Sequence, residues 1–101
     1  MSALSDIVTT LLATPGSEHV LPHGLRLRYA EDAWHHLYLS RNRVYPSQTE
    51  VRTLMDVLVG LGVRGVQQRT DPSDERYWTI ELFWADARQM ALFEQMPDIS
   101  V

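Results

Sequence analysis

The sequence predicts a single α+β domain, residues 1–101, in which a four-stranded antiparallel sheet carries helices mainly on one face. Three observations support this fold class. Apolar residues recur with helical spacing in some segments and alternate with polar residues in others. The two kinds of segment follow one another in the order α-β-β-α-β-β-α, so that neighbouring strands can pair as hairpins. A chain of 101 residues, 45% of them apolar, is also long enough for one core.

Three segments have the pattern of a helix. The first has one apolar face made by residues at i, i+3, i+4, i+7 and i+8, namely Leu4, Ile7, Val8, Leu11 and Leu12. The second begins with a capping box, in which Ser47 and Glu50 are spaced to bond each other's backbone, and we expect it to run to about Leu61 and to end at Gly62. The third is predicted to follow Asp86 and to carry Met90, Leu92, Phe93 and Met96.

Four segments are predicted to be strands, at residues 25–29, 34–40, 63–70 and 77–84. A loop is expected at 17–24 and a turn at 71–74. The segment from Trp34 to Ser40 is ambiguous, because Trp34, Leu37, Tyr38 and Arg41 also fit helical spacing. Its aromatic content and the strand just before it favour a strand.

The composition limits the classes of function. The chain has no cysteine, which excludes disulfides and thiolate metal sites. Its longest apolar runs are far shorter than the roughly 20 residues needed to cross a bilayer. The first twelve residues contain Asp6 and no basic residue, which is not typical of a signal peptide. We therefore expect a cytoplasmic protein. The net charge of −4 argues against non-specific binding to nucleic acid.

The motifs that resemble catalytic or cofactor sites have simpler explanations. Residues 60–65 spell GxGxxG, but they follow a helix and precede a strand, the reverse of a dinucleotide site. The chain has four histidines, His19, His23, His35 and His36. His19 and His23 are four residues apart, but Pro22 disrupts the helix that such a metal-binding pair needs, and His35 and His36 would point to opposite faces of a strand. The sequence contains no cysteine nucleophile and no GxSxG. We expect no catalytic residue, cofactor or metal, although a small enzyme or metal-binding protein is kept as an alternative.

The most informative group of residues is predicted on the sheet face away from the helices. If the strands alternate as expected, this face carries Arg26, Arg28, Trp34, His36, Tyr38, Tyr77 and Phe83. Tyrosine, tryptophan and arginine are enriched in the centres of protein interfaces. The same residue types can stack on single-stranded nucleic acid, and another part of the chain could also cover them. We expect a non-catalytic interaction module, most simply a homodimer or a complex with another protein; nucleic acid is less favoured, and no membrane partner is expected.

Part of the chain resembles the winged-helix regulators of the MarR type. The likeness lies in residues 47–61 as the recognition helix, 71–76 as the wing tip, and Ile80, Glu81 and Leu82 as the returning strand. The resemblance implies a helix over residues 31–40 and a DNA-binding function. The conformation of residues 31–41 therefore separates the two interpretations, since an extended segment supports the sheet and a helix supports the winged helix.

Overall fold

The computed structural model describes residues 3–71 and 76–85, which form an α+β fold with one antiparallel sheet. In chain order the elements are α1 (Ala3–Ala13), β1 (Glu18–Val20), the 3-10 helix η1 (Pro22–Gly24), β2 (Arg26–Glu31), β3 (His35–Asn42), α2 (Gln48–Gly60), β4 (Gln67–Asp71) and β5 (Tyr77–Trp84). The predicted fold class is confirmed. The helix predicted after Asp86 and most of the turn predicted at 71–74 lie outside the described residues.

The sheet has five strands, in the order β1-β2-β3-β5-β4, where the sequence predicted four. The additional strand is β1, which lies in the segment predicted to be a loop. It has only three residues, too few for alternation to be visible in the sequence. It forms because β2 is available as a partner: Glu18 lies opposite Arg28, and the Tyr29 N–H donates to the Ser17 carbonyl at 3.0 Å.

The conformation of residues 31–41 separates the predicted sheet from the winged helix. After a turn at 32–34, this segment is extended and forms β3. β3 pairs with β2 on one side and with β5 on the other, so it lies in the middle of the sheet. The winged-helix alternative is therefore wrong, because a strand occupies the place where that fold needs a helix. Pairing on both sides of β3 satisfies its backbone and buries Leu37 and Leu39, which decides between two patterns that the local sequence leaves balanced.

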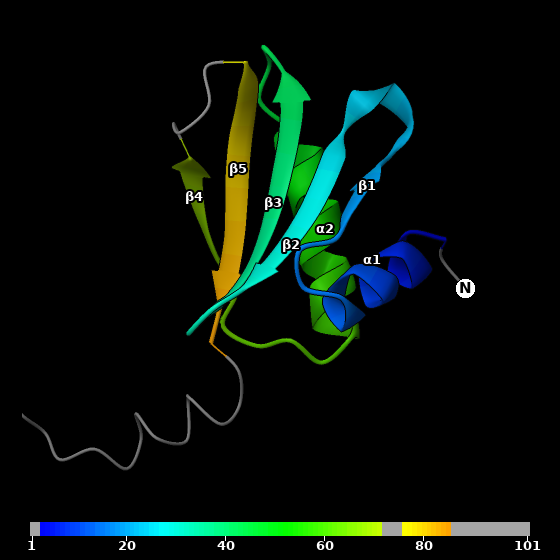
Figure 1. The fold of residues 1–101 in the computed structure, drawn as a ribbon, viewed down its shortest axis with the longest axis vertical. Coiled ribbons are helices and arrows are strands. Elements are labelled where there is room, and N and C mark those ends of the chain that lie inside the picture. Colours follow the sequence, from blue (N-terminus) through cyan, green and yellow to red (C-terminus); the bar gives the residue numbers. More distant parts are fainter. Residues whose placement is uncertain (1–2, 72–75, 86–101) are drawn as a thin grey trace, which may run out of the picture.

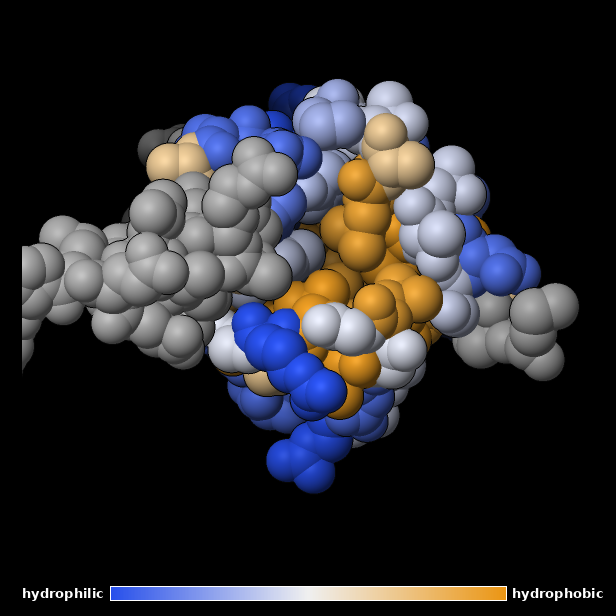
Figure 2. Space-filling view, turned by 90° about the horizontal axis from the view of Figure 1, so that it is seen from below, coloured by the Kyte–Doolittle hydropathy of each residue, from blue (hydrophilic) through white to orange (hydrophobic). Residues whose placement is uncertain are grey.

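The strand predicted at 63–70 is shorter than expected and begins at Gln67. Gly65 has a φ of +68°, in the left-handed region that a continuous strand does not use. Residues 61–66 instead form the connection from α2 to β4, at the lower end of the molecule (Figure 1). Apolar side chains reach the surface at this lower end, where polar side chains border them (Figure 2).

Both described helices pack on the same face of the sheet (Figure 1). Alternate strand residues, among them Leu27, Leu39 and Leu82, point towards the helices and are fully buried. They meet Val8 and Leu11 of α1 and Val51, Leu54 and Leu58 of α2 in one hydrophobic core. Trp78 alternates with the buried residues Ile80 and Leu82, but it lies at the end of β5, is 41% exposed and packs against the Tyr45 ring.

The capping box predicted at the start of α2 is present. The Ser47 hydroxyl accepts from the Glu50 N–H at 3.1 Å, and the Glu50 carboxylate accepts from the Ser47 N–H at 2.9 Å. Glu50 also accepts two hydrogen bonds from the Arg41 guanidinium, which ties the start of α2 to β3. Together these donors, with Arg41 the strongest, lower the pKa of Glu50 to about 2. Gly62 follows the helix with a φ of +94°, as expected of a glycine that ends one.

Candidate interaction face

The sheet surface opposite α1 and α2, here called the outer face, holds every residue of the predicted interaction site. Arg26 and Arg28 come from β2, His36 and Tyr38 from β3, and Tyr77 and Phe83 from β5, while Trp34 lies just before β3. The strand register places Arg28 opposite Tyr38 and His36 opposite Phe83. Figure 1 shows α1 and α2 on the other side of the sheet, and no element of the described ranges 3–71 and 76–85 covers the outer face.

Arginine–aromatic pairs organise this face. The Arg26 guanidinium lies over the Tyr77 ring at 4.4 Å, and the Arg28 guanidinium lies over the Tyr38 ring at 4.5 Å. A third pair joins Arg69 of β4 to Phe83 at 4.7 Å. Arg69 was not among the predicted site residues. Arg69 lies in a polar edge strand, where the sequence gives little indication of which side chains face which way. Alternation with Gln67 is the sole sequence feature that places Arg69 on the outer face.

The rings on this face also contact one another. The His36 and Tyr38 rings stack at 5.9 Å, and the Trp34 ring meets Phe83 edge to face at 6.1 Å. All four of these side chains are half-buried, as is Tyr77. Such contacts hold the rings in fixed positions, which reduces the conformational entropy that they would lose on binding a partner.

The centre of the outer face contains a buried carboxylate, Glu81. This residue is only 2% exposed, although alternation with Phe83 along β5 places it on the outer face. Its carboxylate lies 2.9 Å from the Nδ1 of His36 and accepts from the Arg69 guanidinium at 3.0 and 3.2 Å. The Arg69 guanidinium, joined by His36 when that ring is protonated, offsets the cost of burying this charge. The sequence signal for Glu81 is that it is the single charged residue of β5.

A second carboxylate holds the other side of the His36 ring. The Nε2 of His36 lies 2.9 Å from the Oδ1 of Asp32, in the turn between β2 and β3. The same oxygen accepts from the Trp34 N–H at 2.7 Å. Burial by itself lowers the pKa of His36, but the hydrogen bonds to Glu81 and Asp32 outweigh it, and the net pKa is raised. The pKa of Asp32 is lowered, first by the Trp34 N–H and then by His36.

The charges on the described part of the outer face balance when His36 is protonated. The cationic groups are Arg26, Arg28, His36 and Arg69, and the acidic groups are Glu18, Asp32, Asp71 and Glu81. Glu18 forms an ion pair with Arg26 at the β1 edge. A neutral face with fixed charges of both signs is suited to another protein surface and has no excess positive charge for a phosphate backbone.

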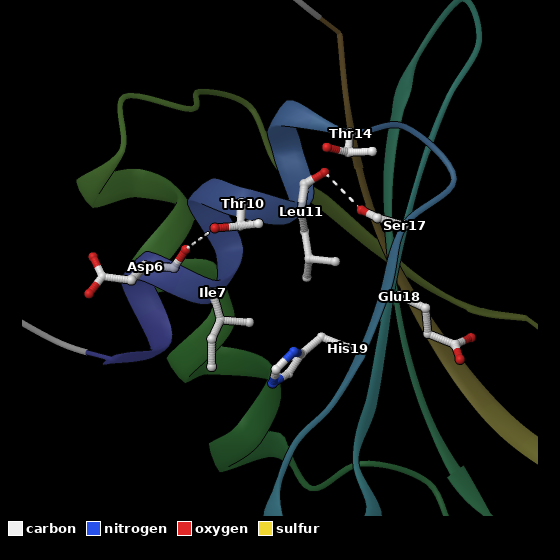
Figure 3. A pocket seen from close by; sticks show the side chains of 8 residues that line it. All are labelled: Asp6, Ile7, Thr10, Leu11, Thr14, Ser17, Glu18 and His19. Atoms are coloured by element: carbon white, nitrogen blue, oxygen red, sulfur yellow. Dashed lines mark hydrogen bonds between the residues drawn. The ribbon is translucent and has the colours of Figure 1, made fainter.

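A separate pocket of about 350 Å³ lies between α1 and the segment around β1 (Figure 3). Ile7 and Leu11 form its apolar part, and the His19 ring points towards them. The Thr10 hydroxyl donates to the Asp6 carbonyl at 3.0 Å, and the Ser17 hydroxyl donates to the Leu11 carbonyl at 3.2 Å. The hydroxyl protons of Thr10 and Ser17 are therefore already used in hydrogen bonds within the protein.

The described residues contain no cluster of three His, Asp or Glu side chains that could hold a metal ion. Within the same part of the chain, each helix is too short or too polar to cross a membrane. No known protein family, characterised protein or solved structure matches the chain. A function is therefore inferred from the geometry and chemistry of the outer face.

Proposed function

We propose that this protein is a non-catalytic interaction module that forms a homodimer through its outer face. The observation that carries the proposal is a sheet surface, uncovered by α1 and α2, on which half-buried rings are held under arginine side chains. Trp34 and Tyr38 are suited to anchor such an interface, because large aromatic side chains supply most of the binding energy in protein interfaces.

A second copy of the chain is the partner best suited to this surface. In a two-fold dimer the same patch faces itself, so the patch must be self-complementary. When His36 is protonated, the four cationic and four acidic groups of the outer face meet this condition, because two copies can approach without net repulsion. Arg28 adds an exposed planar donor that can pair with a carboxylate of the other copy.

The test is the oligomeric state in solution. Trp34→Ala and Tyr38→Ala should each weaken the dimer by about 2 kcal/mol, or about 30-fold in Kd, if the two rings are interface hot spots. Sedimentation equilibrium measures this change directly. Trp78→Ala and Tyr45→Ala are matched controls, because both rings are exposed but lie away from the outer face, and neither should change Kd. A wild-type protein that stays monomeric at high micromolar concentration would exclude the dimer.

A further inference from the structure

His36 is held between two carboxylates, one at each ring nitrogen. Its Nδ1 lies 2.9 Å from Glu81 and its Nε2 lies 2.9 Å from Asp32. Ionised carboxylates only accept hydrogen bonds, and a neutral imidazole has a single N–H to donate. Both contacts are therefore hydrogen bonds only when His36 carries two protons and a positive charge.

Loss of the second proton affects the two contacts differently. The Glu81 side chain is almost fully buried, whereas the Asp32 side chain is 69% exposed and can be solvated by water. The buried carboxylate loses more without its donor, so neutral His36 keeps its proton on Nδ1, facing Glu81. The Nε2 lone pair then faces Asp32, whose oxygen also holds the Trp34 N–H. The contact that positions Trp34 is thereby weakened.

The other charged groups near His36 do not replace this proton. Arg69 of β4 lies on the far side of Glu81 and already donates to it. Arg28 of β2 lies over Tyr38, the ring on which His36 stacks. Asp71 of β4 and the Tyr38 phenol add no positive charge. The helices α1 and α2 pack on the opposite face of the sheet and so do not approach His36. Among the groups named here, His36 is therefore the one whose charge changes near neutral pH.

We propose that the outer face is a proton-dependent interface, in which the doubly hydrogen-bonded His36 must be protonated for two copies to associate tightly. This inference rests on the dimer proposed above. With His36 neutral, each copy presents three cationic groups against four acidic ones, so two apposed faces carry a net charge of about −2 by this count. Each copy also holds Trp34 less firmly, because the contact between Asp32 and His36 is weakened. Association therefore strengthens as pH falls and weakens as pH rises through the titration of His36.

The expected size follows from the number of protons involved. Each copy contributes one His36, so up to two protons are bound when a dimer forms. Kd should rise by at least about tenfold between about pH 6 and about pH 9. Burial lowers the pKa of His36, but the hydrogen bonds to Glu81 and Asp32 outweigh it and raise the pKa, so the change is centred above the ordinary pKa of histidine.

The experiment is sedimentation equilibrium of the full chain across this pH range, with two substitutions. His36→Gln cannot gain the proton, so its dimer should be weak and its Kd should not change with pH. His19→Gln is the matched control, because His19 is exposed and lies off the outer face; it should keep the wild-type pH dependence. If His36→Gln does not fold, Asp32→Asn replaces it. The asparagine oxygen can still accept the Trp34 N–H, and loss of the carboxylate should shift the pH profile to lower pH.

The outcomes separate the two proposals. A wild-type chain that is monomeric at every pH overturns the homodimer and this inference with it. A dimer whose Kd is constant between about pH 6 and about pH 9 overturns only the inference. Retention of the wild-type pH dependence by His36→Gln also overturns it, since another group would then be titrating. NMR titration of the His36 ring provides an independent reading, and its midpoint should fall in Asp32→Asn.

Discussion

The link between Glu50 and Arg41 makes a quantitative prediction about stability. Glu50→Gln keeps the size of the side chain, and the amide oxygen can still accept from the Ser47 N–H. The substitution removes the negative charge that the Arg41 guanidinium binds through two nitrogens. It therefore tests the ion pair between α2 and β3 while leaving most of the capping box in place.

The shift in the pKa of Glu50 sets the size of the expected loss in the free energy of unfolding. A pKa lowered from 4.5 to about 2, chiefly by Arg41, corresponds to about 3 kcal/mol favouring the charged form. Because the Glu50 side chain is 29% exposed, solvent screening reduces this contribution, and we expect about 1.5 kcal/mol. Glu50→Gln should lower the free energy of unfolding by about this amount at neutral pH.

The pH dependence distinguishes the ion pair from a general packing effect. Since the folded-state pKa is the lower one, the contribution is complete above about pH 4.5 and is lost as pH falls through about 2. The difference between wild type and Glu50→Gln should therefore shrink to less than about half at about pH 3. Urea unfolding followed by circular dichroism measures both values.

Asp56→Asn provides the control, because Asp56 is exposed on the same helix, and its effect should stay within about 0.5 kcal/mol. A Glu50→Gln penalty of the same size at neutral pH and at about pH 3 would refute the reasoning, as would no penalty at neutral pH.

Two further predictions concern the fold. Ser47→Ala removes the hydroxyl that caps α2 and should lower the free energy of unfolding by about 1 kcal/mol, measured by urea unfolding; an unchanged midpoint would show that the cap is not needed. Leu82→Ala leaves a cavity where a fully buried side chain of the interior strand β5 meets the helices, and should cost about 3 kcal/mol in the same assay. A loss below about 1 kcal/mol would contradict the burial of Leu82.

The sequence predicts which side chains share the outer face, but not the contacts between them. Alternation along β2, β3 and β5 was enough to place seven residues on one face, because successive side chains of a strand point to opposite sides. The site residues predicted from the sequence do not include Arg69 or Asp32. Their importance comes from contacts with Glu81 and His36, and neither belongs to a pattern that repeats along the chain.

The sequence by itself determined the elements with strong local signals. The apolar stripe of α1, the capping box and glycine stop of α2, and the alternation of β5 each arise from residues close in the chain. Only the tertiary structure decided that residues 35–42 are a strand and that residues 18–20 extend the sheet, because both depend on partners supplied by other strands. The contact between His36 and Glu81 joins positions 45 residues apart. Strand register creates that contact, and register is a property of the assembled sheet.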